Sequence, residues 1–320
     1  MKQVAAGVAS DFLSYTTREV DEQLPSLAKA SPFLAQVEAA LQARNTSHML
    51  RRGDARDLSF LANDSVHLAL TSPPYWTLKE YNSSDGQLGA ISDYEKFHIE
   101  LNRAWEEAFR VLVPGGRLIV VVGDVCLSRR ASGRHRVVPL HADIQVNCTR
   151  IGFDNLAPII WYKIANAAFE AEGNGGGFLG KPYEPNAVVK NDIEFILMLR
   201  KPGGYRSPSP EARLLSIIGA ENHKKWFQQV WNDVKGESTR DHPAPYPIEL
   251  AERLIRMFSF VGDIVIDPFC GTGSTIVAAM KAARNSVGVE IDPHYVELAR
   301  SRIEASRPNL HGSRAFTVVR

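Results

Sequence analysis

The segment DIVIDPFCGTGST, residues 263–275, decides the fold that we expect for this chain. Its apolar run, Ile264 to Ile266, indicates a buried strand over Asp263 to Ile266, and its Gly-Thr-Gly turn opens a helix expected over Thr275 to Ala283. A second apolar run, Val287 to Val289, supplies the next strand. Because parallel strands joined by a helix need helices on the faces of their sheet, this βαβ unit predicts an α/β protein.

Outward from this unit, apolar runs and helical periodicity alternate along the chain. We predict a helix capped by Ser31, a long helix that starts at Ser92 and Glu95 with capping-box spacing and stops at residues 114–116, and another that opens at Pro247. Further strands are predicted at residues 48–52, 66–70, 118–122, 158–162 and 193–199. Strands that alternate with helices imply a doubly wound, mixed but mostly parallel α/β sheet.

This pattern divides the chain into four parts. Residues 1–47 are expected to form a helical N-terminal extension, and residues 48–165 and 242–320 supply the two halves of the sheet domain. Residues 166–241 show no long periodic pattern apart from the core strand near 193–199. Because long irregular segments inside a compact domain usually carry function, this part is expected to be a functional insertion.

Composition limits the class of protein. The chain has 320 residues, of which 44% are hydrophobic and 23% charged, as in an ordinary globular protein. It has neither an apolar run of about 18 residues nor an N-terminal signal pattern, so we expect a cytoplasmic protein without membrane association. Cys126, Cys148 and Cys270 form no CxxC pair, which indicates a reducing compartment and no metal site.

The Gly-Thr-Gly turn predicts a site for a nucleotide-like cofactor. Gly271 and Gly273 let a ligand approach the backbone, and Glu290, 19 positions after Gly271, is placed to accept from both ribose hydroxyls. A dinucleotide would require a third glycine, whereas the turn continues with Ser274, so S-adenosylmethionine fits better. Asp267 is expected to pair with its ammonium group. An ordinary tight turn is the alternative, which the paired acid disfavours.

The segment TSPPYW, residues 71–76, predicts an acceptor clamp for an amino group. Proline lacks an N–H, so Pro73 and Pro74 present only carbonyls on a stiff backbone. A base amino group donates twice, and the Ser72 hydroxyl and the Pro73 carbonyl would accept both hydrogens and localise the nitrogen lone pair. Tyr75 offers a face to a base drawn out of the helix. A proline turn with Tyr75 in the core is the alternative, which the cofactor turn disfavours.

Together the two segments resemble the S-adenosylmethionine-dependent amino-methyltransferases of DNA, in the permuted motif order of their β group. TSPPYW is similar to the catalytic motif in its serine form, which is commoner among cytosine-N4 than adenine-N6 enzymes, and DPFCGTGST to the cofactor motif. The resemblance covers His48 to Ile303. It implies a seven-stranded, Rossmann-like methyltransferase sheet with a small target-recognition insertion between Lys163 and Pro243.

The resemblance also implies a fuller set of site residues. Gly53-Asp54 resembles an adenine-contacting segment, residues 288–292 the motif after the cofactor turn, and residues 242–247 a segment that closes over the methionine end. Residues 160–163 resemble a late strand beside the base pocket. The implied catalytic residues are Ser72, Pro73, Pro74 and Tyr75. The implied cofactor residues are Asp54, Thr71, His242, Pro243, Asp267, Phe269, Cys270, Gly271, Gly273, Ser274, Thr275, Glu290 and Ile291.

The implied reaction is site-specific transfer of a methyl group to N4 of a flipped cytosine in double-stranded DNA. N6 of adenine is the alternative, because both bases offer an amino group beside a ring acceptor nitrogen. Cytosine-C5 methylation is excluded, since it needs a cysteine that follows a proline and no cysteine here does. An RNA methyltransferase, and an inactive protein that only binds cofactor and DNA, are further alternatives; the intact clamp disfavours the second.

A net charge of +1 means that any DNA-binding surface must be a local patch. No acid lies between Asp124 and Asp143, and a flexible phosphate-binding loop is predicted there, with a merely solvated loop as its rival. The candidate DNA-binding residues are Arg129, Arg130, Arg134 and Arg136, with Lys224 and Lys225 as a second group. The sequence leaves open the recognition sequence, the choice between monomer and homodimer, and whether a restriction endonuclease accompanies the protein.

Overall fold

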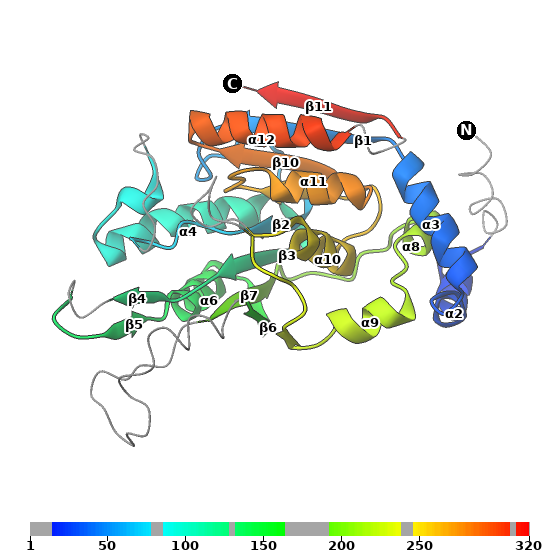
Figure 1. Cartoon of the computed structure of the whole chain (residues 1–320), viewed down its shortest axis with the longest axis horizontal. Helices are drawn as coiled ribbons and strands as arrows, with labels where there is room; N and C mark the ends of the chain where they lie inside the picture. The colour runs from blue at the N-terminus through cyan, green and yellow to red at the C-terminus, as the bar shows by residue number, and fades with distance from the viewer. Residues whose placement is uncertain are drawn as a thin grey trace, which may run out of the picture.

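The computed structural model describes residues 15–77, 86–127, 132–163, 192–237, 246–307 and 312–319. Its frame is a nine-stranded sheet in the order β11-β1-β10-β9-β2-β3-β7-β6-β8 (Figure 1). The strands are β1 (Thr46–Arg52), β2 (Val66–Thr71), β3 (Leu112–Val122), β6 (Asp154–Tyr162), β7 (Ile193–Arg200), β8 (Val230–Trp231), β9 (Ile264–Asp267), β10 (Asn285–Glu290) and β11 (Arg314–Val319). β4 (Val125–Leu127) and β5 (Arg136–Val138) form a separate hairpin.

The sheet confirms the expected doubly wound, mostly parallel fold. Among its pairings only those of β7, with β3 and with β6, are antiparallel. The sheet exceeds the expected seven strands by one at each edge, because β11 pairs with β1 and the two-residue β8 pairs with β6. Neither was predicted, since β8 is too short to show a pattern and β11 lies at the exposed edge with few buried residues.

The centre of β3 shows how the core is layered. Leu118, Val120 and Val122 belong to one hydrophobic cluster, whereas Ile119 and Val121 belong to another. Successive side chains of a strand point to opposite faces, so a continuous apolar run is buried on both sides. The sheet is therefore the middle of three layers.

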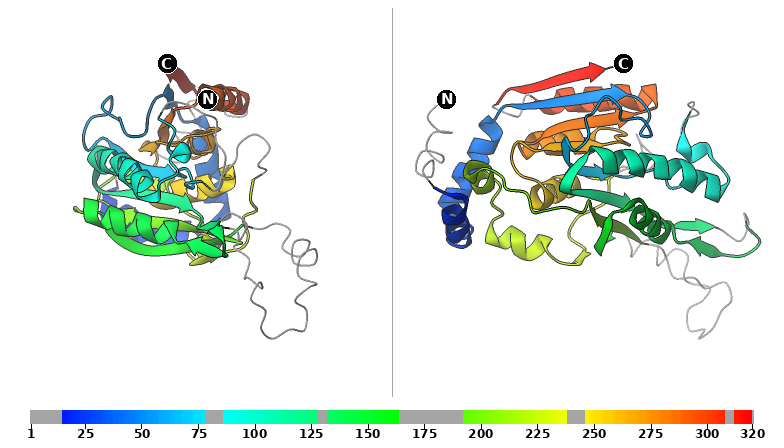
Figure 2. Two further views of the ribbon diagram at one scale, coloured as in Figure 1. Left: turned by 90° about the vertical axis from the view of Figure 1, so that its left-hand side faces the viewer. Right: turned by 180° about the vertical axis from the view of Figure 1, so that it is seen from behind.

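Helices cover both faces of the sheet (Figure 2). α4 (Tyr94–Val111) and α6 (Leu140–Ile151) contribute to the cluster on one face, and α10 (Ile248–Phe258) and α11 (Ser274–Lys281) to the cluster on the other. α12 (Pro293–Ser306) packs on α11 and β1. The remaining helices are α2 (Thr17–Leu27), α3 (Ser31–Ala43), α8 (Pro210–Leu215), α9 (Ala220–Trp226) and the 3-10 turn η1 (Leu88–Ala90).

Two predicted helix caps are wrong by one residue. α3 begins at Ser31 with Ala30 as its N-cap and no capping side chain, so Ser31 lies inside the first turn. α4 is capped by Asp93, whose carboxylate accepts from the Lys96 amide at 2.8 Å, in place of Ser92. An aspartate satisfies a free N-terminal amide as well as a serine does, so the two adjacent residues compete for the cap.

Two further features concern the whole of the described chain. None of its helices combines the length and the apolar character that crossing a membrane requires. Within the same residues, no group of three or more metal-ligating side chains comes together. The N-terminal helices α2 and α3 pack with α8, Val261 and Ala283 in a separate hydrophobic cluster.

Candidate active site

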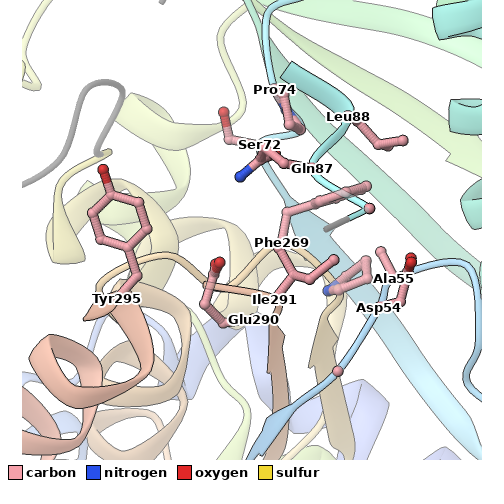
Figure 3. A pocket seen from close by; sticks show the side chains of 13 residues that line it. Asp54, Ala55, Ser72, Pro74, Gln87, Leu88, Phe269, Glu290, Ile291 and Tyr295 are labelled. Carbon is pink, nitrogen blue, oxygen red and sulfur yellow. The ribbon is translucent and has the colours of Figure 1, made fainter. Parts of the chain in front are cut away.

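The candidate site lies where neighbouring parallel strands end. β10, β9 and β2 are adjacent in the sheet, and their last residues are Glu290, Asp267 and Thr71. Parallel strands present their carboxyl ends along one edge, where α/β proteins bind ligands. A cleft with about 560 Å³ of empty space, part of it open to solvent, opens at this edge (Figure 3). Its lining residues are Gly53, Asp54, Ala55, Ser72, Pro74, Gly86, Gln87, Leu88, Pro268, Phe269, Glu290, Ile291 and Tyr295.

The cofactor turn requires glycine at its bends. Gly271 has φ 51° and Gly273 has φ 82°, a left-handed conformation that residues with a Cβ rarely adopt. Gly273 is also the N-cap of α11. The turn folds back over β10, where a Cβ on Gly288 would lie 2.5 Å from Cys270 Sγ. The turn therefore has bends that require glycine, and because neither Gly271 nor Gly273 is among the residues that line the cleft, their expected contact with a ligand stays a prediction.

Glu290 is a buried carboxylate at the floor of the cleft. One oxygen accepts from the Gly271 amide at 2.8 Å and the other from the Asp292 amide at 2.9 Å. Burial raises its pKa to about 7, although the two amide hydrogen bonds oppose this shift. Each carboxylate oxygen retains a lone pair, so Glu290 can accept two further hydrogen bonds from a ligand.

Asp267 joins the catalytic segment to the cofactor turn. One oxygen accepts from the Thr71 hydroxyl at 2.6 Å and from the Phe269 amide at 3.1 Å. The other accepts from the Tyr246 hydroxyl at 2.9 Å and from the Thr275 hydroxyl. The carboxylate is buried, which raises its pKa, and Asp267 is not among the residues that line the cleft. Its expected role as a direct partner of the cofactor ammonium stays a prediction.

Sequence reasoning missed Tyr246 as a site residue. It lies in the segment 242–247 that was expected to close over the cofactor. His242 and Pro243, the two residues predicted from that segment, fall outside the described part of the chain. Its buried hydroxyl contacts both Asp267 and Thr275. The sequence signal that could have identified Tyr246 is its position between two prolines, Pro245 and Pro247.

The catalytic segment forms a short chain of hydroxyl groups. The Ser72 hydroxyl donates to the Tyr75 hydroxyl at 3.2 Å, which donates to the Val121 carbonyl at 3.4 Å. A carbonyl only accepts, so Tyr75 must donate to it, and Ser72 must donate to Tyr75. Ser72 and Pro74 line the cleft, whereas Tyr75 is 3% exposed within the core. The expected stacking of Tyr75 on a base stays a prediction.

A second polar group lies across Gly123 from this clamp. A Cβ on Gly123 would lie 3.5 Å from Tyr75 Cε2 and 3.3 Å from Glu194 Cγ. Glu194 accepts an ion-paired hydrogen bond of 2.5 Å from Lys163 Nζ. Gly123, which directly follows β3, therefore packs closely against both Tyr75 and Glu194, and a larger residue there would press on both side chains. Sequence reasoning noted the strand that ends at Lys163 but missed Glu194.

Asp54, in the segment that follows β1, also lines the cleft. Burial alone would raise its pKa, but hydrogen bonds from the Arg56 amide and side chain hold the pKa of this carboxyl below its usual range. Arg56 is also paired with Glu100 on α4. Asp54 is thus fixed and ionised in the same cleft as Ile291 and Phe269, two of its apolar lining residues.

Two more of the predicted cofactor residues, Cys270 and Ser274, belong to the cofactor turn itself. The Ser274 hydroxyl accepts from Arg302 at 3.2 Å, and Arg302 also donates to Thr272 and to Glu237. Cys270 is buried, which raises the pKa of its thiol well above the usual value. These contacts tie α12 and the segment around Glu237 to the cofactor turn.

The predicted DNA-binding residues are divided between two places. Arg134 and Arg136 are exposed on the β4–β5 hairpin, which follows the carboxyl end of β3 and so flanks the cleft edge (Figure 1). Part of the expected flexible loop is therefore paired backbone. Lys224 and Lys225 are exposed on α9, whose first amide, that of Ala220, bonds to Ala28 beside the N-terminal helices. Arg129 and Arg130 lie outside the described residues.

Comparisons with known proteins agree with this geometry. Residues 66–301 match the N6/N4 methyltransferase family, described as DNA methylase. The Type II methyltransferase M.MjaI of Methanocaldococcus jannaschii is 37% identical over 290 residues, which span 81% of this chain and 91% of the relative. M.MthZI of Methanothermobacter thermautotrophicus is 34% identical over 280 residues, spanning 81% and 77%.

Solved structures show the same fold. TTHA0409 of Thermus thermophilus, in complex with S-adenosyl-L-methionine, is 50% identical with a TM-score of 0.70, and the alignment covers 85% of this chain and 98% of that one. The cytosine-N4-specific PvuII DNA methyltransferase is 16% identical with a TM-score of 0.59, covering 85% and 96%. At that identity the likeness concerns the fold alone.

Proposed function

Because the chain belongs to the N6/N4 family of DNA methylases, we propose that it transfers a methyl group from S-adenosylmethionine to N4 of a flipped cytosine in double-stranded DNA, at a specific site. That it is a DNA methyltransferase rests on the family and on relatives spanning most of the chain. The choice of cytosine rests on the clamp around Ser72 and on the Lys163–Glu194 pair.

The cleft suits S-adenosylmethionine. Glu290 has an unused lone pair on each oxygen and lines the cleft, which matches the two hydroxyls of a ribose. Phe269 and Ile291 provide apolar surface for an adenine, and Asp54 supplies a fixed acceptor beside them. When bound, the cofactor supplies an electrophilic methyl group. Its presence in the related TTHA0409 structure supports this assignment.

The observation that carries the proposed chemistry is the direction of the hydroxyl chain. Because Ser72 donates its hydrogen to Tyr75, its oxygen faces the cleft as an acceptor. The Pro73 carbonyl is a second acceptor, and the absence of an N–H in both prolines leaves no competing donor. An amino group held by two acceptors has its lone pair free and oriented for attack, so this chain contributes mainly positioning and electrostatics.

The Lys163–Glu194 pair favours cytosine as the base. β2, β3 and β7 are adjacent, so the strands that carry Ser72 and Glu194 are about 10 Å apart at the same edge of the sheet. Lys163, oriented by Glu194, carries only donors. Cytosine held by its amino group presents two acceptors, N3 and O2, to that side, whereas adenine presents N1 and a C–H. A lysine is therefore better matched to cytosine.

Product analysis tests the proposal. Duplex DNA methylated by the purified protein is digested to nucleosides and analysed by mass spectrometry, and we expect N4-methylcytosine. N6-methyladenine alone would overturn the base assignment but keep the clamp mechanism. Transfer of label to RNA in preference to duplex DNA, or no transfer at all, would favour the RNA-directed or the inactive alternative.

A further inference from the structure

A second groove lies at the opposite end of the sheet from the cleft. It has about 1620 Å³ of empty space, part of it open to solvent, and is formed by the amino ends of β2 and β3, the end of β7, parts of the segment 203–227 and the end of α10 with the residues that follow it. Five arginines and one histidine line it, and the lining found among the described residues includes no aspartate or glutamate. Four of these arginines are paired with acids outside the lining, so within the described chain Arg117 is the one guanidinium of the groove without an acid partner.

Arg117 and Arg200 form the centre of this charge. They are directly opposite each other in the antiparallel pair of β3 and β7. Like charges placed opposite each other destabilise a sheet, and burial together with Arg200 lowers the pKa of Arg117. Arg200 is ion-paired with Asp154, whereas within the described chain Arg117 has the ring of Phe258, at 5.3 Å, and no acid. A bound anion would relieve this repulsion.

The other arginines of the groove are held in place. Arg206 is forked onto Asp263, Arg213 is paired with Asp21, and Arg256 is paired with Glu38 and Glu252. Their acids lie outside the groove lining, so each guanidinium is fixed with part of its surface toward the groove. Preorganised arginines of this kind are suited to phosphate, because the planar guanidinium donates to two oxygens at once.

Exposed aromatic rings accompany the arginines. Tyr205 is 97% exposed and Phe227 is 48% exposed, and both line the groove. The backbone before Tyr205 is fixed, since Lys201 exchanges backbone hydrogen bonds with Gly115 and Gly116. A large ring presented to solvent on an anchored segment is a surface on which a base can stack.

We propose that this groove binds a phosphorylated nucleotide unit, either free or within a nucleic acid strand. Arg117 and Arg200 would hold the phosphate, and Tyr205 and Phe227 would contact the base. The groove is separate from the catalytic cleft, because the stretch of β3 from Arg117 to Val122 alone spans about 17 Å. The proposal is independent of which base the enzyme methylates.

Binding of oligothymidylate, measured by fluorescence anisotropy, tests this site. An oligomer of about ten thymidines contains no amino base to methylate, and excess S-adenosylhomocysteine fills the cofactor cleft. We expect binding that Arg117→Gln weakens by about tenfold and that has a flatter salt dependence, since one phosphate contact accounts for about 0.7 in the slope. Tyr205→Ala should weaken binding by a similar factor, whereas the exposed Arg150→Gln on α6 should have no effect.

Two further measurements complete the test. Thymidine monophosphate is the second probe: affinity equal to that of the oligomer indicates a free nucleotide as ligand, and weaker affinity indicates a strand. Photocrosslinking of an oligomer with 5-iodouracil should label Tyr205 or Phe227 and does not depend on any variant folding. Crosslinks only at other residues, no binding of either probe, or equal binding by wild type and Arg117→Gln would overturn the proposal.

Discussion

The hydroxyl of Thr71 donates a 2.6 Å hydrogen bond to the buried carboxylate of Asp267, so the end of the catalytic strand is fixed to the start of the cofactor turn. The two residues are 196 positions apart in the chain but belong to adjacent strands, β2 and β9. Because Asp267 also holds Thr275 and Tyr246, one carboxylate sets the relative position of the clamp and the cofactor turn.

We predict that Thr71→Val lowers the free energy of unfolding by about 1–3 kcal/mol, the usual cost of leaving a buried acceptor without its donor. It should also lower kcat for methyl transfer, because the clamp loses its fixed position relative to the cofactor. Thr71→Ser retains the hydroxyl and serves as the matched control. Urea denaturation and steady-state kinetics measure both effects; a Thr71→Val protein with the kcat of wild type would show that the bond is structural only.

Glu290 should make cofactor binding depend on pH. Its carboxylate must be ionised to accept from ribose hydroxyls, and burial raises its pKa to about 7. We therefore expect affinity for S-adenosylmethionine, measured by calorimetry, to fall by up to about tenfold per unit as pH drops below 7. Glu290→Gln should bind weakly with a flat profile. Constant wild-type affinity between pH 8 and about 5.5 would contradict the assigned role.

The same shift predicts the opposite trend for the stability of the protein without cofactor. Between the usual pKa of 4.5 and the folded value of about 7, the folded state holds a proton that the unfolded state has lost. Its stability relative to Glu290→Gln should therefore fall by about 3 kcal/mol as pH rises through this window. Denaturation of both proteins at several pH values measures the difference and cancels the contribution of other groups.

Tyr75→Phe tests the direction of the hydroxyl chain. Without the phenol oxygen, Ser72 loses the acceptor that keeps its own lone pairs toward the base. We expect kcat to fall by roughly tenfold to a hundredfold while cofactor affinity stays nearly unchanged, as for a contact that acts in the transition state. Tyr94→Phe, which removes a hydroxyl bonded to Asp143, is the matched control. Equal losses in the two variants would assign Tyr75 a packing role.

Lys163→Met tests recognition of the base edge. We expect kcat/KM on cytosine to fall by about tenfold, since a hydrogen bond from a charged donor is lost. With 3-deazacytosine, which lacks the N3 acceptor, the kcat/KM values of wild type and variant should differ by less than they do with cytosine. Lys201→Met removes a lysine at the other end of the sheet and is the control. If kcat/KM of wild type exceeds that of Lys163→Met by the same factor of about ten on both bases, Lys163 does not contact N3.

The sequence by itself determined the strand-turn-helix units and their chemistry. Gly271 and Gly273 were recognisable because a tight turn that admits a ligand needs residues without a Cβ, and Ser72 with two prolines because few segments offer only acceptors. The apolar run of β3 indicated a strand buried on both faces. Each of these signals depends on neighbouring residues, and local sequence carries such information.

Only the tertiary structure decided which distant groups meet. That Tyr246 and Thr71 share the carboxylate of Asp267, and that Glu194 lies beside Gly123, follows from the order and register of the strands. The edge strands β8 and β11 likewise form because neighbouring strands offer free backbone groups. Register and strand order are set by packing over the whole sheet, so no single segment contains them.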